Sequence, residues 1–226
     1  MNRYDLLYCV LALLIFLFLT LLVLYYCKDR SPIELFSHID LSTLYDNAND
    51  GDLIFFEGDS LSEQFIKRVL GTNFNHVGIL IKEDGRLFII ESDVGQRYSS
   101  GPRIIPLEDK IKYYKGSKYI GYRPININVV NKMGLNINKD RILSIASSQF
   151  GKGFDNNMTS FVFGLIGMGT SIKDKKDLYC SEYVGHILNK LGIAKKRGCY
   201  SPKIFEDDDV LKKGIYNDIK IIRVDL

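Results

Sequence analysis

The chain has 226 residues, of which 46% are hydrophobic and 25% are charged, and its formal net charge is +3. This length suits one membrane segment and one soluble domain with a core of its own, and it excludes a chain of several large domains. The charge bias is weak and no arginine-rich arm is present, so we expect no nucleic acid among the partners.

An uncharged apolar segment, residues 6–26, opens the chain. As an α-helix these residues would measure about 31 Å, close to the roughly 30 Å of bilayer hydrocarbon. A signal peptide is the alternative, but Tyr-Tyr-Cys-Lys follows the segment where a small-residue cleavage site would be required. We therefore predict that residues 1–30 form a single-pass anchor that contacts membrane lipid through residues 6–26, that residues 31–50 form a linker, and that residues 51–226 form the soluble domain.

Sequence patterns predict the elements of the soluble domain in chain order. We expect a strand over 53–56, a helix over 62–70, and a hairpin whose strands, 76–82 and 87–93, flank a turn at Asp84-Gly85. Residues 94–118 are expected to form a loop with a short helix or strand. A strand over 119–124, helices over 139–150 and 179–191, and one or two strands over 215–224 complete the series. Because strands dominate the first half and helices the second, the fold class is α+β.

The predicted hairpin brings His76 close to acidic side chains. A turn at Asp84-Gly85 places Asp93 directly opposite His76 and Glu91 on the diagonal, and side-chain alternation puts all three on one face. Either carboxylate would then orient the imidazole. Gly78, between them, would leave open space on that face.

Cys180 is expected in the first turn of the helix over 179–191. A helix N-terminus stabilises a thiolate through the helix dipole and its unpaired N–H groups. Of the three histidines, His186 would point away from Cys180 around the helix and His38 lies ahead of the domain, so His76 is the candidate base. The alternative interpretation of Cys180 is a buried structural cysteine. Glu182, on another side of the same helix, is expected to face solvent.

The other cysteines have no pattern that suggests a metal or a disulfide. No two of the four cysteines form C-x-x-C, and no group of Cys and His has the spacing of a zinc site. We therefore predict no metal and no cofactor. The three thiols other than Cys180 are expected to be unrelated to the site: Cys9, Cys27 and Cys199.

Five short motifs in a fixed order resemble a known family. They are GDLIFF (51–56), HVGILI (76–81), FIIES (88–92), ASSQFGKGFD (146–155) and LYCSEYV (178–184). Together, over about residues 50 to 205, they are similar to the permuted papain-like enzymes of the NlpC superfamily, in the YiiX-like branch. The resemblance implies a circularly permuted papain-like domain, with an antiparallel sheet packed on helices. It also implies Cys180 as nucleophile, His76 as base, and Glu91 in preference to Asp93 as the orienting acid.

The function implied by this resemblance is that of a cysteine hydrolase, and the apolar segment 6–26, a departure from the family pattern, would make it membrane-anchored. Such an enzyme cleaves an amide or acyl (thio)ester bond through an acyl-enzyme, as an amidase, peptidase or thioesterase does. Two alternatives stay open: a lipid-directed acyltransferase or lipase, which the apolar insert 161–169 would suit, and a catalytically silent membrane-tethered structural protein. The expected substrate is a peptide, an amide or an acyl-lipid. A thiol nucleophile favours a domain on the cytosolic side of the membrane.

Overall fold

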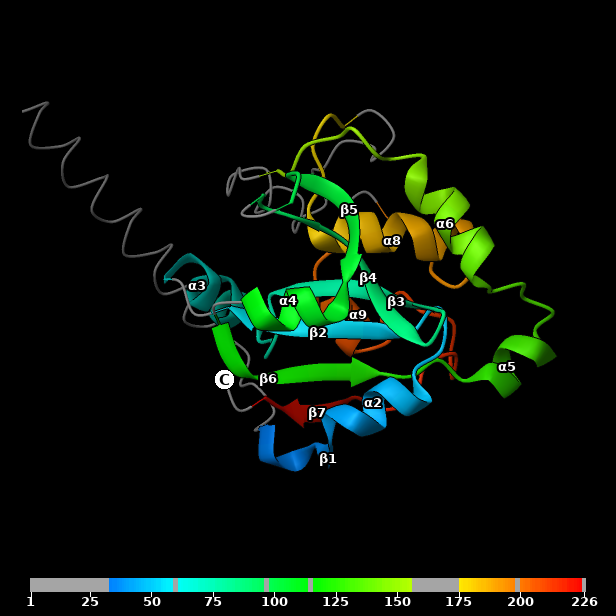
Figure 1. Ribbon diagram of the computed structural model, residues 1–226, viewed down its shortest axis with the longest axis horizontal. Coiled ribbons are helices and arrows are strands. Elements are labelled where there is room, and N and C mark those ends of the chain that lie inside the picture. Colours follow the sequence, from blue (N-terminus) through cyan, green and yellow to red (C-terminus); the bar gives the residue numbers. More distant parts are fainter. Residues whose placement is uncertain are drawn as a thin grey trace, which may run out of the picture.

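A seven-stranded sheet, in the order β1-β7-β6-β2-β3-β4-β5, forms the centre of the molecule (Figure 1). The computed structural model describes residues 33–58, 61–95, 98–113, 116–155, 175–197 and 200–224. The strands are β1 (Ser37–Ile39), β2 (Leu53–Gly58), β3 (His76–Glu83), β4 (Arg86–Asp93), β5 (Gly101–Pro106), β6 (Gly116–Arg123) and β7 (Lys220–Arg223). The helices are η1 (Ile33–Leu35), α2 (Leu41–Asn47), α3 (Leu61–Leu70), α4 (Leu107–Tyr113), α5 (Ile127–Lys132), α6 (Lys139–Ser147), α8 (Cys180–Lys190) and α9 (Lys203–Glu206).

The β3–β4 hairpin has the register that the sequence predicts. Ile79 pairs with Ile90 and Glu83 pairs with Arg86. At the turn, Asp84 and Gly85 have φ values of 48° and 76°. A two-residue hairpin turn needs this left-handed backbone, which Asp tolerates and Gly adopts freely. The turn therefore sets the register, and the register sets which side chains share a face.

The sheet divides the core into two clusters. On one side, odd-numbered residues of β3 such as Val77 and Ile79 pack with the apolar stripe of α8, including Val184 and Ile187. On the other side, even-numbered residues such as Leu80 pack with residues of α2 and α4. Figure 1 shows α4 lying across the near face of the sheet. Helices α4 and α8 thus lie on opposite faces of the sheet.

The sheet is not wholly antiparallel, which corrects the prediction. The edge strand β1 runs parallel to β7, with Ser37 beside Lys220 and Ile39 beside Ile222. The segment predicted as a linker, 31–50, contains η1, β1 and α2. β1 has only three residues, two of them exposed and one half-buried. This is too short for apolar and polar residues to alternate visibly, so the sequence does not predict a strand here.

The predicted membrane segment lies outside the described residues. Within the described ranges no helix has both the length and the apolar character needed to cross a bilayer. Residues 6–26, the apolar insert 161–169 and the thiols Cys9, Cys27 and Cys199 all fall outside those ranges. The anchor accordingly stays a prediction from sequence.

Candidate active site

Cys180 is the first residue of α8, and its side chain is buried at 6% exposure. The sulfur lies 3.9 Å from the backbone carbonyl oxygen of Asn75, the residue before β3. Two hydrogen bonds fix the start of the helix: Ser92 Oγ donates to the Leu178 carbonyl, and Ser181 Oγ donates to the Tyr200 carbonyl, each at 2.7 Å. The thiol is thus held at a helix N-terminus, where a negative charge is stabilised.

His76 is buried at the start of β3, where its ring is bonded to Glu91 and lies close enough to Cys180 for the thiol to influence its pKa. Nε2 lies 2.7 Å from Glu91 Oε2. An ionised carboxylate only accepts hydrogen bonds, so Nε2 carries the proton and Nδ1 is the nitrogen that remains for the thiol. Burial and the Lys110 ammonium lower the pKa of His76. Charge on Cys180 and Asp93, with a hydrogen bond to the Cys180 side chain, raises it, and the net pKa lies above the ordinary value.

Glu91 is fully buried and accepts hydrogen bonds on both of its oxygens. Oε1 accepts from Arg103 Nε at 3.0 Å and from Arg103 Nη2 at 2.7 Å. Oε2 lies 2.7 Å from Lys110 Nζ, besides its bond to His76. Burial alone would raise the pKa of Glu91, but Lys110, His76 and Arg103 hold it well below its usual range. The acid is therefore ionised throughout the neutral range.

Asp93 completes a cluster in which the fixed charges balance. Its Oδ2 lies 3.0 Å from Arg103 Nη2 and 2.7 Å from Lys110 Nζ. Two carboxylates thus face two cations, and the remaining members are the imidazole and the thiol. Transfer of a proton from sulfur to imidazole leaves the net charge of this buried group unchanged, so a thiolate–imidazolium pair adds no uncompensated charge to the core.

The thiol and the imidazole approach each other from different sides of the sheet. Cys180 belongs to the core cluster around α8. The ring of His76 lies 6.1 Å from the ring of Phe56, which belongs to the cluster around α4. The two side chains lie near each other at the start of β3, next to Asn75, whose carbonyl oxygen is 3.9 Å from the sulfur.

The side chains of His76, Glu91 and Asp93 place one donor atom each within 4.8 Å of one another, as metal ligands do. The position between the two carboxylates is already taken by the Lys110 ammonium, at 2.7 Å from each. Arg103 binds both carboxylates as well. A divalent cation would have to displace these bonds, so the donor set does not fit a metal.

Two predictions about neighbouring side chains are wrong. Glu182, expected in solvent, is fully buried; its carboxylate lies 2.5 Å from Lys175 Nζ and accepts from the Tyr179 backbone N–H. Gly78, expected to leave open space, instead lets Ile89 approach, since a Cβ there would lie 2.5 Å from Ile89 carbons. Lys175 thus neutralises the charge of Glu182, and Ile89 fills the space beside Gly78. Neither neighbour can be predicted from the local sequence pattern.

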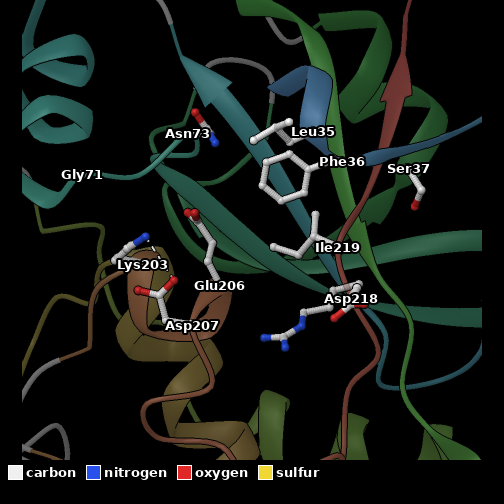
Figure 2. Close-up of a pocket in the computed structure, with 11 residues that line it drawn as sticks. Leu35, Phe36, Ser37, Gly71, Asn73, Lys203, Glu206, Asp207, Asp218 and Ile219 are labelled. Carbon is white, nitrogen blue, oxygen red and sulfur yellow. Dashed lines mark ion pairs between the residues drawn. The ribbon is translucent and has the colours of Figure 1, made fainter. Parts of the chain in front are cut away.

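A separate pocket of about 480 Å³ lies between α9 and the segments that lead into β1 and β7. Figure 2 shows Glu206 facing the apolar side chains of Phe36 and Ile219 across this space. Burial raises the pKa of Glu206 to about 7, and Thr72 donates a hydrogen bond to its carboxylate. Cys180, His76 and Glu91 are not among the lining residues, so this pocket is distinct from the cluster above.

Comparison with known proteins decides the family. The family described as "permuted papain-like amidase enzyme, YaeF/YiiX, C92 family" matches residues 47–220. The chain belongs to this family. The resemblance predicted from the five motifs is thereby confirmed, and the mixed α and β architecture fits a papain-like fold.

The solved structures that are similar to this member of the C92 family include one of a bacterial protein. It is described as the metalloprotein yiiX from Escherichia coli O157:H7, with a TM-score of 0.44 and 17% sequence identity, over 77% of this chain and 88% of that chain. No curated protein matches the chain.

In this C92 chain, the structure also brings residues to the site that the sequence did not single out. Arg103 and Lys110 both lie in the stretch 94–118, which was predicted as loop with one short element but contains β5 and α4. One signal was available: a second hairpin after β4 would have set Arg103 directly opposite Glu91, as the register shows. Ser92 was inside a quoted motif, but its bond to Leu178 joins residues 86 positions apart and has no local signature.

Proposed function

We propose that this protein is a cysteine amidase that hydrolyses an amide bond through an acyl-enzyme on Cys180. One observation carries the proposal: Cys180 lies close enough to His76 to influence the pKa of this imidazole, and its Nε2 is bonded to a buried, ionised carboxylate. A positioned base that is itself oriented by a third group is the arrangement that activates a thiol for nucleophilic attack.

In the proposed first step, the thiolate of Cys180 attacks the carbonyl carbon of the substrate. The carbonyl π electrons move to oxygen, and backbone N–H groups in the first turn of α8, which have no intrahelical acceptor, donate to that oxyanion. The C–N bond then breaks, and the His76 imidazolium gives its Nδ1 proton to the leaving amine. The products are a thioester on Cys180 and a free amine.

In the proposed second step, water replaces the amine. Neutral His76 takes a proton from water through Nδ1, and the resulting hydroxide attacks the thioester carbon. The C–S bond breaks, a carboxylic acid leaves, and the thiolate–imidazolium pair is restored. Glu91 keeps its hydrogen bond from Nε2 through both steps, which holds the ring orientation and stabilises the imidazolium form.

The proposed chemistry needs no metal. The similar E. coli structure is described as a metalloprotein. In this chain the carboxylates of Glu91 and Asp93 are already bonded to Lys110 and Arg103, so no step is assigned to a metal ion. We also propose, from sequence alone, that residues 6–26 tether the enzyme to a membrane with its catalytic domain on the cytosolic side.

The test is the alkylation rate of Cys180 in the full-length protein, measured peptide by peptide by mass spectrometry because other thiols are present. Wild type is compared with His76→Ala and with His38→Ala as the matched histidine control. We expect wild type and His38→Ala to react with iodoacetamide at pH 6, where ordinary thiols, with a pKa near 8.5, are almost wholly protonated. His76→Ala should react at pH 6 at least tenfold more slowly, because the thiolate then lacks its imidazolium partner.

Equal alkylation of Cys180 in wild type and His76→Ala at pH 6 would remove the case for a catalytic pair. A positive result is followed by incubation with a library of peptide amides and a search for a thioester-linked mass on Cys180. Cys180→Ala must abolish that adduct.

A further inference from the structure

Arg103 uses every donor that its side chain has. Nε and Nη2 donate to Glu91 Oε1, and Nη2 also donates to Asp93 Oδ2. Nη1 donates to the backbone carbonyls of Val94, at 3.3 Å, and Ser99, at 3.2 Å. A guanidinium has five N–H groups in a fixed plane, and all of them have an acceptor here.

The acceptors of Arg103 come from two different parts of the site. Glu91 and Asp93 belong to β4, whereas Val94 and Ser99 belong to the connection between β4 and β5. Arg103 itself lies opposite Glu91 in the β4–β5 register and is only 8% exposed. The guanidinium therefore joins the acid to the connection beside it and fixes the plane of the carboxylate.

That plane determines where Glu91 Oε2 lies. With Oε1 held by two hydrogen bonds that converge on it from one guanidinium, Oε2 has little freedom to rotate, and it lies 2.7 Å from His76 Nε2. Lys110 shares Oε2 but, as a point charge on a flexible stem, sets no plane.

We propose that Arg103 is a positioning residue of this site: its planar guanidinium fixes the Glu91 carboxylate so that it orients His76 toward Cys180. This inference rests on the proposed function, because it assigns Arg103 an effect on the reactivity of Cys180. It goes beyond the proposed function because the reactivity of Cys180 would depend on the planar shape of the Arg103 guanidinium as well as on its positive charge.

The test replaces arginine by lysine, which keeps the charge and loses the planar fork. Three full-length variants are compared with wild type: Arg103→Lys, Arg123→Lys and Arg86→Lys. Arg123 is the control for a buried arginine, since it donates to the carbonyls of Asn217 and Phe205 and pairs with Asp208, away from the site. Arg86 is the exposed control and pairs with Glu108.

The readout is the pH profile of Cys180 alkylation, with the fold of each variant checked by circular dichroism. In Arg103→Lys we expect the midpoint of the profile to move up by about one pH unit, which is about tenfold slower alkylation on its acid side. Arg123→Lys should lose stability and keep the wild-type midpoint, and Arg86→Lys should keep both. A folded Arg103→Lys protein with the wild-type midpoint overturns the proposal.

A second measurement covers the case in which Arg103→Lys does not fold. In wild type, the Arg103 Nε–H should give an exchange-protected NMR signal, and this signal should shift when Cys180→Ala removes the thiolate and changes the charge on His76. A signal that is identical in wild type and Cys180→Ala overturns the coupling. Loss of alkylation in His76→Ala tests the proposed function by itself, so failure of one claim is distinguishable from failure of the other.

Discussion

Glu91 has no contact with solvent, yet it keeps a full negative charge because three donating side chains surround it. Such a carboxylate is stable only while its partners stay in place. Removing one member of a buried ion pair leaves an uncompensated charge, which costs about 3–5 kcal/mol. The residue that orients the base is therefore also a determinant of stability.

Glu91→Gln should lower the free energy of unfolding by about 3–5 kcal/mol at pH 7, because Arg103 and Lys110 then lose one of the two anions that they share. The pKa of Glu91 is lowered in the folded state, so its stabilisation is complete above the ordinary value of 4.5 and disappears as the pH falls below that value. The difference between wild type and Glu91→Gln should therefore shrink below pH 4.5. Urea unfolding from pH 7 to pH 3 measures it.

Glu108→Gln is the matched control for this substitution. Glu108 is 59% exposed and pairs with Arg86 on the surface. Loss of a surface pair costs about 0–1 kcal/mol. A Glu91→Gln protein as stable as Glu108→Gln, or a difference from wild type that does not change with pH, would contradict the assignment of Glu91 as a buried, ionised acid.

At the scale of single residues, the sequence predicts the site residues that lie in recognisable motifs. It does not predict the residues that bind and orient them. Cys180, His76 and Glu91 lie in three quoted motifs, and the structure brings all three together. Their catalytic roles stay a prediction until the alkylation test is done. Arg103 and Lys110 lie in a stretch where short elements follow one another, and their roles depend on a cross-strand register and on a helix that no local pattern predicts.

Among the elements, α8 has an unusually close neighbour at its centre. Gly185 faces the ring of Tyr200, and a Cβ at this position would lie 2.5 Å from ring atoms. Tyr200 is in turn stacked on Phe205, with ring centroids 5.8 Å apart. The carbonyl of Tyr200 also accepts from Ser181, next to the nucleophile. The absence of a side chain at Gly185 thus sets how closely α8 approaches this segment.

Gly185→Ala should destabilise the protein, although alanine favours helix more than glycine does. The propensity gain is about 1 kcal/mol, whereas overpacking costs about 1–3 kcal/mol. Because the displaced Tyr200 segment holds Ser181, alkylation of Cys180 should also slow. The measurements are urea unfolding and the alkylation rate.

The control in this case is Ser144→Ala, at an exposed position of α6. Its effect on stability should stay within about 0.5 kcal/mol. A Gly185→Ala protein that is more stable than wild type would show that Tyr200 can move without cost, and the close approach would then have no structural role.

Long elements with a clear period were predicted well, and several short ones were not, although the short strands β2 and β7 fall where strands were predicted. α3, α6 and α8 follow their predicted ranges to within a few residues, since an amphipathic stripe marks each. β1, α5 and α9 have between three and six residues. Elements this short form because the surrounding core selects them, so their own sequence contains too little information.

For the whole molecule, β7 joins the first part of the described chain to the rest of the sheet. It pairs with β1 in parallel and with β6 in antiparallel orientation. Its two central residues face opposite sides: Ile221 packs in the cluster around α8 and Ile222 in the cluster around α4. A single strand therefore contributes to both halves of the core.

Ile222→Ala should cost about 2–5 kcal/mol, and Ile222→Val about 0.5–1.5 kcal/mol, because the side chain is fully buried and the cavity grows with each carbon removed. Unfolding in urea gives both values. Hydrogen exchange should show loss of protection in β1 as well as β7. Protection of β1 that is unchanged in Ile222→Ala would mean that β1 does not depend on its partner.

The placement of the site at the start of β3 has a consequence for how the protein can vary. The sulfur belongs to the α8 side of the sheet, and the ionic cluster, which includes Lys110 of α4, belongs to the other side. Lys110 of α4 contacts the two carboxylates and influences the pKa of the imidazole, whereas the sulfur packs with the residues around α8. Substitutions on the α4 side can therefore change the reactivity of the thiol without changing the surface around it, and substitutions on the α8 side can change that surface without altering the ionic cluster.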